Sequence, residues 1–156
     1  MQAASARRDA SRRRIAIVRL SQDVRVASDP LFDLPLTDAE RHLLWAGLVE
    51  WGGPARCTDE LAVAMGFGSV ADLFAQGDRI ERALKDREPL TRDDWVRTLL
   101  ATEIVFASNV VGSGHDWSIT TGMSDEESIR LLRSVQERIP ARRSQGWWVE
   151  NWPERG

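Results

Sequence analysis

The chain has 156 residues, of which 42% are hydrophobic and 29% are charged, a composition that favours one globular domain over a disordered or fibrous chain. No run of 18 apolar residues is present, which excludes a membrane-spanning helix, and the single cysteine, Cys57, excludes an internal disulfide. The net charge of −3 is unevenly spread, because the first 20 residues carry six arginines and one acidic residue, so the remainder is acidic.

Residues 1–28 are expected to form a basic, largely disordered arm. The arm could contact nucleic acid through five arginines, but a solvated arm is the simpler interpretation; they are Arg7, Arg8, Arg12, Arg13 and Arg14. The run of three arginines resembles a twin-arginine export signal, yet the apolar stretch that follows covers only residues 15–18. A signal needs about 7–15 apolar residues there, so we expect a cytoplasmic protein.

Residues 29–36 hold two prolines and four large apolar side chains, which predicts an extended strap that packs against the body through Leu31, Phe32, Leu34 and Leu36. Five N-terminal capping signals follow, at Thr37, Thr58, Ser69, Thr91 and Ser124. They predict helices over residues 38–51, 59–65, 70–86, 92–107 and 125–139. Glycine in a helix interior destabilises the helix, so Gly77 is expected to break or kink the third helix.

The predicted helix over residues 92–107 is apolar nearly all round in its second half. Such a pattern is typical of a buried helix, so we expect this segment to be the most buried. Asn109 is a plausible left-handed terminator, and residues 110–121 are expected to form a small extended or hairpin element. The last helix is predicted to bury Ile129, Leu132, Val135 and Ile139.

The predicted fold is therefore mainly α, a single bundle-like helical domain of five to six helices with a minor hairpin element near residues 110–121. The domain is expected to span residues 29–140. A tryptophan-rich tail, residues 141–156, follows it.

A catalytic site is only weakly indicated. Glu103 lies within the most apolar run, where burial without a partner would raise its pKa, although pairing with Arg130, Arg133 or a backbone amide is the simpler expectation. His115 and Asp116 follow a glycine-rich loop and could share a pocket with Glu103. The glycines match no phosphate-binding spacing, and no serine or cysteine has a hydrolase context, so we expect no cofactor. No Cys or Cys/His spacing is typical of a metal site, so we expect no metal either.

Residues 58–84 resemble a helix-turn-helix, the motif of an alternative DNA-binding regulator. The would-be recognition helix, residues 70–80, carries Asp72 and Asp78 with only Arg79 as a basic residue. DNA affinity depends on neutralising phosphates, so the acidic residues weigh against this alternative.

Seven tryptophans are many for this length. Trp45, Trp51, Trp95 and Trp117 are most simply placed in or near the core. Tryptophan is also favoured at binding surfaces, and the candidates for binding are Trp117 in the loop and three tail residues, Trp147, Trp148 and Trp152. The alternative for the tail is that it folds back onto the body.

Three stretches, LLWAGLVEWGGPARCTDELAVAMGF, LLATEIVFASNVVGSGHDWSITTG and SDEESIRLLRSVQERI, resemble an uncharacterised small actinobacterial protein family over about residues 37–140. The resemblance implies a bacterial cytoplasmic origin and carries over no site residue. The leading functional hypothesis is a non-enzymatic protein-interaction or regulatory module, for example of the antitoxin or immunity type. The alternatives are the DNA-binding regulator and a small enzyme that uses Glu103 with His115 and Asp116.

Overall fold

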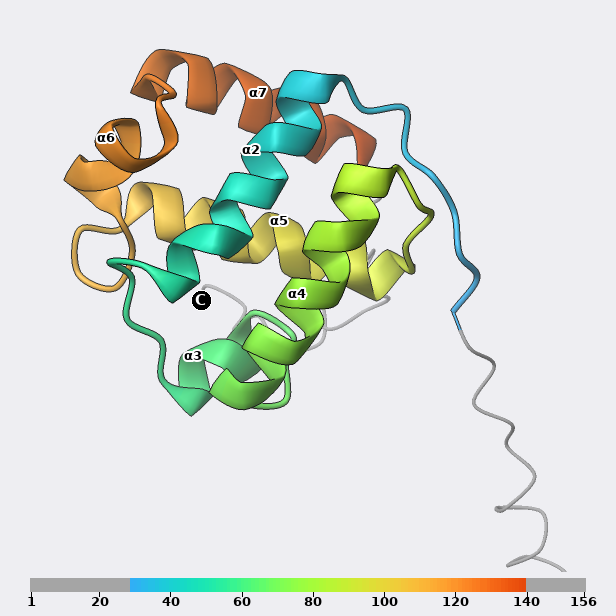
Figure 1. The fold of residues 1–156 in the computed structure, drawn as a ribbon, viewed down its shortest axis with the longest axis horizontal. Coiled ribbons are helices and arrows are strands. Elements are labelled where there is room, and N and C mark those ends of the chain that lie inside the picture. The colour runs from blue at the N-terminus through green and yellow to red at the C-terminus, as the bar shows by residue number, and fades with distance from the viewer. Residues whose placement is uncertain (1–28, 140–156) are drawn as a thin grey trace, which may run out of the picture.

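The computed structural model describes residues 29–139, and this part of the chain is helical, with no strand among its elements. Figure 1 shows the helices α2 (Asp38–Val49), α3 (Asp59–Ala64), α4 (Val70–Asp86), α5 (Arg92–Ala107), α6 (Trp117–Thr121) and α7 (Asp125–Arg138). Two 3₁₀ turns accompany them, η1 (Glu50–Gly52) and η2 (Gly114–Asp116). The prediction of a small, mainly helical domain is confirmed.

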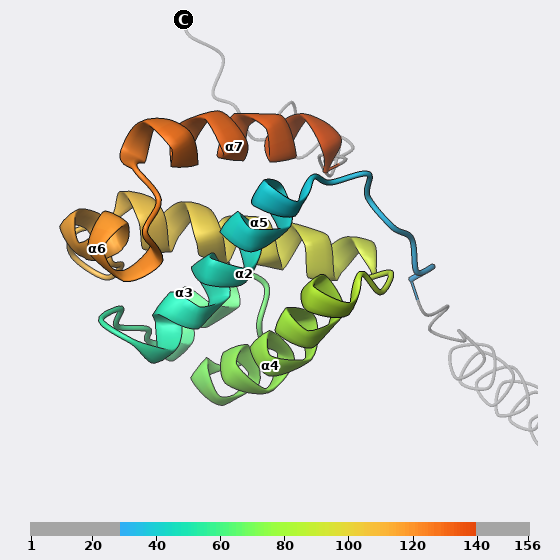
Figure 2. The same cartoon turned by 45° about the horizontal axis from the view of Figure 1, so that its top comes forward.

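Helix α2 lies at the centre of the domain. It packs against α5, α4 and α7, and Figures 1 and 2 show these three helices arranged around it. Seven of its 12 residues are buried, whereas α5 buries six of 16. The prediction that α5 would be the most buried helix is therefore wrong. Leu99, Leu100 and Ile104 of α5 are only partly buried, because hydrophobicity alone does not say which face neighbouring helices will cover.

The predicted helix starts are confirmed. At Thr37, Thr58, Ser69, Thr91 and Ser124 the side chain accepts a hydrogen bond from the backbone N–H three residues on. At two of these, the Glu40 and Asp94 carboxylates also accept from the backbone N–H of their own capping residue, Thr37 or Thr91. Capping depends on neighbours in sequence, which is why these positions were predictable.

Helix α4 runs through Gly77 and ends at Asp86, so the expected break is absent. Leu73, Ile80 and Leu84 are buried on either side of the glycine. Their burial outweighs the cost of about 1 kcal/mol for glycine in a helix interior. The helix ends where Arg87 adopts a left-handed conformation, with φ of 56°.

Residues 110–121 do not form the expected hairpin. The loop leads into η2 and α6, and Trp117 at the start of α6 is buried, with its Nε1 donating to Ser128 Oγ at 2.8 Å. Asn109 is not left-handed either; its Oδ1 instead accepts from the His115 backbone N–H at 2.9 Å. Burial of a large indole decided the local conformation here, and no local pattern revealed it.

The strap and α7 differ from prediction at single positions. Leu34 and Leu36 are buried and Phe32 bridges to Leu90, but Leu31 is 63% exposed. Helix α7 buries Leu131 and leaves Ile129 51% exposed. The predicted arm, residues 1–28, and the predicted tail, residues 141–156, lie outside the described residues.

Candidate functional site

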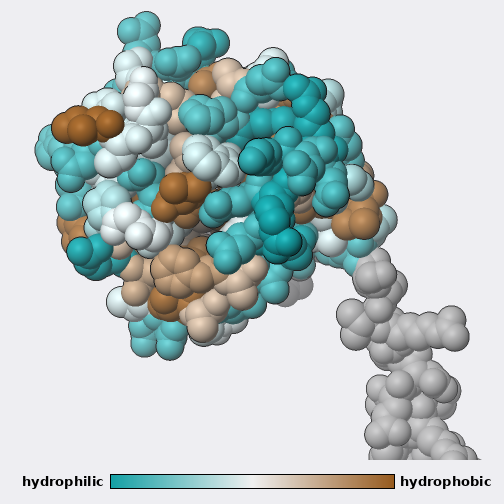
Figure 3. Space-filling view, viewed as in Figure 1, coloured by the Kyte–Doolittle hydropathy of each residue, from teal (hydrophilic) through white to brown (hydrophobic). Residues whose placement is uncertain are grey.

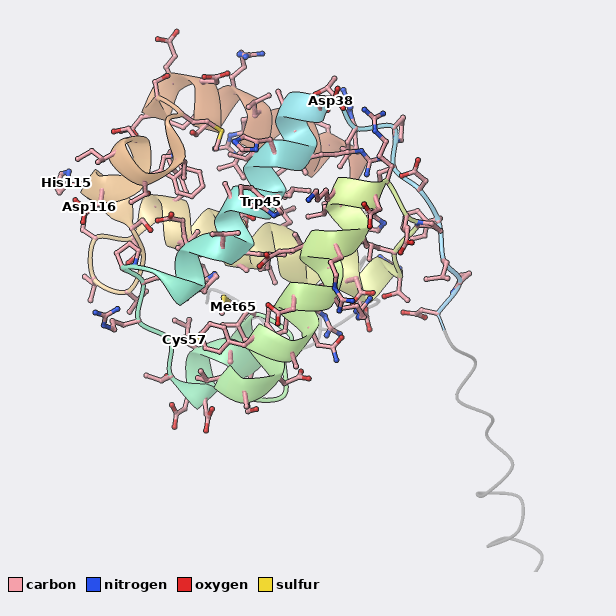
Figure 4. The ribbon with its side chains drawn as sticks, viewed as in Figure 1. Asp38, Trp45, Cys57, Met65, His115 and Asp116 are labelled. Carbon is pink, nitrogen blue, oxygen red and sulfur yellow. The ribbon has the colours of Figure 1, made fainter. Side chains whose placement is uncertain are left out.

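The three predicted catalytic residues are not brought together. Glu103 lies on α5 and accepts a hydrogen bond from Gln136 Nε2 of α7 at 2.5 Å, so its partner is neither Arg130 nor Arg133. It lines a hollow of about 250 Å³ between α5 and α7, and neither His115 nor Asp116 lines that hollow. Both are exposed in η2, and Figure 4 shows them at the edge of the molecule, away from its other labelled residues. The arrangement supplies no acid–base pair for catalysis.

A buried carboxylate lies elsewhere, at the end of α2. Glu50 is 6% exposed, and its Oε2 accepts a hydrogen bond from the hydroxyl of Ser113, which is also buried. The Ser113 backbone N–H donates to the Val105 carbonyl at 2.8 Å. These bonds attach the loop after α5 to the end of α2, so Glu50 is explained by packing rather than chemistry.

The helix-turn-helix candidate corresponds to α3 and α4. Helix α4 carries Asp72, Asp78, Glu81 and Asp86 against Arg79, Arg82 and Lys85. Arg79 is engaged by Asp94 of α5 at 2.6 Å, which removes one cation from the face that would meet DNA. Acidic residues therefore outnumber basic ones along α4, whereas phosphate binding requires a predominantly basic surface.

Trp117 has no exposed surface, so the structure places it in the core and not on a binding surface. Trp51 and Trp95 are buried as well, whereas Trp45 on α2 is 36% exposed. The Trp45 ring stacks on His42, one turn earlier, with ring centroids 5.5 Å apart and planes inclined by 23°. Trp147, Trp148 and Trp152 lie outside the described residues. Within residues 29–139, Trp45 is therefore the indole available to a ligand.

Trp45 forms part of a groove between α2 and α4. The groove consists of two adjoining hollows of about 470 and 410 Å³, which share Trp45 and Lys85. The larger is lined by Asp38, Arg41, His42, Trp45, Leu84, Lys85 and Arg87, and the smaller also by Asp78, Glu81 and Arg82. Each hollow falls in the range of about 300–1,000 Å³ that ligand pockets occupy.

The position of the groove follows from the packing of the two helices. Figure 4 shows Trp45 on the side of α2 that faces α4, and Asp38 at the start of α2. In Figure 3 hydrophilic side chains cover the α4 side of this face, and hydrophobic surface is confined to separate patches, one over α3 and the start of α4. The groove thus joins one aromatic surface to a polar rim.

The larger hollow is locally basic on an acidic domain. Its lining has three cations, Arg41, Lys85 and Arg87, against one carboxylate, Asp38. Asp38 is ion-paired with Arg87, and Arg41 is paired with Asp33 of the strap, so Lys85 is the cation of this lining that has no ion pair among the described residues. Residues 29–139 as a whole carry 20 acidic and 11 basic side chains, a net charge of −9. In the smaller hollow, burial and then the nearby Asp78 raise the pKa of Glu81, which favours its neutral form.

Arg41 is unusual within this lining, because it is a charged residue that is only 7% exposed. Its Nη2 donates to Asp33 Oδ1 at 2.8 Å and to the Leu34 carbonyl at 3.2 Å, which ties the strap to α2. The sequence indicated Trp45 as a core-rim residue but drew no attention to Arg41, His42 or Lys85. These side chains line one hollow only because α2 packs against α4, and no sequence motif predicts that contact.

The chain matches no protein-family model, and neither a curated protein nor a solved structure shows significant similarity to it. Within residues 29–139 no group of three histidine, cysteine, aspartate or glutamate side chains could hold a metal ion. None of the described helices combines the length and hydrophobicity needed to cross a membrane.

Proposed function

We propose that the protein is a non-enzymatic interaction module that binds a segment of a partner protein in the groove between α2 and α4. The observation that carries the proposal is the exposed face of Trp45, which opens into this groove and is stacked in place by His42. A held aromatic ring beside a hollow is the usual form of a binding hot spot, because it offers a large apolar contact at little cost in side-chain entropy.

The charge of the larger hollow favours a partner segment with acidic side chains. Lys85 and Arg87 lie at the rim, with Arg41 in the wall. An acidic segment would meet attraction here and repulsion from most of the remaining domain surface, which is acidic. The expected occupant is therefore a peptide segment with an apolar or aromatic side chain for Trp45, flanked by aspartate or glutamate.

Two observations favour a binding role over the enzyme and the DNA-binding regulator that the sequence left as alternatives. An enzyme would need Glu103, His115 and Asp116 to converge, and they do not line one hollow. A DNA-binding regulator would need a basic helix surface, which α4 lacks. A regulatory role in a bacterial cytoplasm, of the antitoxin or immunity type, is a prediction of the sequence that fits a binding module.

The test is a selection of random peptides displayed on phage against the purified full-length protein. We expect enrichment of peptides that combine an aromatic or aliphatic residue with flanking acids. Synthetic copies should bind the wild-type chain, and Trp45→Ala should weaken them by more than about tenfold, as removal of a hot-spot tryptophan does.

Phe74→Ala is the matched control, because Phe74 is another large exposed side chain, 45% accessible, on α4 and lines neither hollow. It should leave peptide binding unchanged. Circular dichroism of each variant would confirm that the fold is intact. A selection without enrichment, or peptides that bind Trp45→Ala as well as wild type, would contradict the proposal.

A further inference from the structure

We infer that the ligand of this groove is anchored by a carboxylate group that binds Arg41, beside a flat apolar group that packs on Trp45. The inference rests on the proposed function and names the chemistry of the group that the same site recognises. It is carried by the unsatisfied hydrogen-bonding state of Arg41 in the groove wall.

Two of the three guanidinium nitrogens of Arg41 have no acceptor. Nη2 is engaged by Asp33 and the Leu34 carbonyl, but Nε and Nη1 are buried and have no hydrogen-bond partner among the described residues. Buried donors without acceptors are rare in folded proteins, because each has lost its hydrogen bonds to water and formed none within the protein. Arg41 lines the larger hollow, but Nε and Nη1 themselves have almost no accessible surface, so a ligand completes their hydrogen bonds only when the side chains around them move.

The internal partner of Arg41 does not fully compensate its charge. Asp33 is 54% exposed, whereas the Arg41 side chain is 8% exposed, so the carboxylate is largely hydrated and the guanidinium is not. A neutral acceptor would fill a hydrogen bond but leave the charge poorly balanced. A carboxylate supplies acceptor oxygens and a negative charge together, which makes it the fitting ligand for a buried arginine.

The neighbours of Arg41 are compatible with this ligand. Asp38, the one carboxylate in the lining of the same hollow, is ion-paired with Arg87 and not with Arg41. Asp38 and Arg87 have side chains that are 82% and 61% exposed, so they can shift when a carboxylate enters. Trp45 lies one helical turn after Arg41 and offers the apolar surface beside it.

The test uses two probes of nearly equal shape on the full-length protein labelled with nitrogen-15. Phenylacetate carries a carboxylate next to a flat ring, and phenylacetamide is its neutral counterpart. We expect phenylacetate to shift the Arg41 Nε–H and Trp45 indole N–H resonances saturably. Phenylacetamide should bind on the order of tenfold more weakly, the usual difference when a charged hydrogen bond becomes neutral.

Arg41→Lys provides a second arm, with Arg130→Lys, an exposed arginine of α7 away from the groove, as control. Arg41→Lys should abolish the preference for phenylacetate, and Arg130→Lys should retain it. Arg41 also holds the strap, so Arg41→Lys can lower the stability of the protein. In that case Lys85→Met, at an exposed position, serves as a second variant. Lys85→Met should reduce the preference for phenylacetate over phenylacetamide but keep the shift of the Arg41 resonance.

The outcomes separate this inference from the proposed function. Equal shifts with both probes, or an unmoved Arg41 resonance, would overturn the carboxylate anchor, even if selected peptides still required Trp45. A strong preference for phenylacetate with no peptide selected would uphold the anchor and reject the partner peptide, leaving a small acid as the ligand.

Discussion

Gly47 of α2 packs directly against Thr102 of α5, so closely that a Cβ atom added at Gly47 would lie 2.3 Å from Thr102 Oγ1. Thr102 is completely buried, and its hydroxyl donates to the Thr98 carbonyl at 2.8 Å. The Thr102 side chain cannot rotate away from Gly47 without breaking this hydrogen bond. Helices α2 and α5 therefore meet across a glycine, because no larger residue fits between them.

Gly47→Ala should consequently destabilise the protein, by roughly 1–3 kcal/mol, as overpacking of a core does. Thermal or denaturant unfolding followed by circular dichroism would measure the loss. Adding Thr102→Ala to Gly47→Ala should recover part of it, because the clashing oxygen and methyl group are removed. Unchanged stability in Gly47→Ala would show that α2 and α5 can separate at little cost.

Gly77→Ala should have the opposite sign, although Gly77 also lies inside a helix. A Cβ atom there would meet nothing within 4 Å, and the position has ordinary helical geometry. Alanine should stabilise α4 by about 0.5–1 kcal/mol, because it has less backbone entropy to lose on folding. A decrease in melting temperature would contradict this expectation and show that the space around Gly77 does not accept a methyl group.

Asp94 should make stability depend on pH in the acidic range. Burial favours a higher pKa for this carboxyl, but hydrogen bonds from Arg79 and Thr91 and the charges of Arg79 and Arg97 outweigh burial and lower it below the ordinary value. The unfolded chain therefore takes up the proton first as pH falls from about 4, and stability is lost down to the folded-state pKa.

Asp94→Asn should remove this part of the pH dependence and cost about 2 kcal/mol near neutral pH, since a charged hydrogen bond to Arg79 is lost. Denaturant unfolding at several pH values between 3 and 7 would measure both effects. The exposed Asp116→Asn is a suitable control, because its carboxylate has no such partner among the contacts of the described residues. Parallel stability curves for wild type and Asp94→Asn would contradict the assignment.

Ser113→Ala should destabilise the protein by about 1–3 kcal/mol, because it leaves the buried Glu50 carboxylate without its hydroxyl donor. The double variant Ser113→Ala with Glu50→Gln should lose less than the sum of the single changes, since no charge is then left unpaired. Strict additivity in denaturant unfolding would argue against a direct interaction of the two side chains.

His115→Ala should leave stability within about 0.5 kcal/mol of wild type, as exposed substitutions usually do. The side chain is exposed, and the bond that His115 makes to Asn109 comes from its backbone N–H, which alanine retains. A melting curve that coincides with wild type is the expected result. Substantial unfolding would reveal a structural role for the imidazole.

The local signals in the sequence were largely sufficient for the helices. Capping residues such as Thr37 and Ser124 act within one turn, so the start of each long helix was predictable from its own few residues. Errors arose where a distant contact overrode a local preference. Trp117 is buried beside Ser128, and its segment forms α6 rather than the predicted hairpin. Helix α4 continues through Gly77 because buried side chains flank the glycine on both sides.

The candidate site was much less predictable than the fold. The sequence drew attention to Glu103, His115 and Asp116 because their residue types suggest chemistry, but their helices and loops direct them to different places. Arg41 and Lys85 are separated by 44 positions and follow no motif, yet both line the hollow beside Trp45. Only the crossing of α2 and α4 brings them together.

The sequence by itself determined that the chain forms a helical domain, where its long helices begin, and which residues are apolar enough to seek the core. The tertiary structure alone decided that α2 is central, that Trp45 stays at the surface, and that Arg41 is buried with two free donors. The reason is physical: helix formation is governed by interactions within about one turn, whereas grooves and buried charges arise between segments distant in sequence.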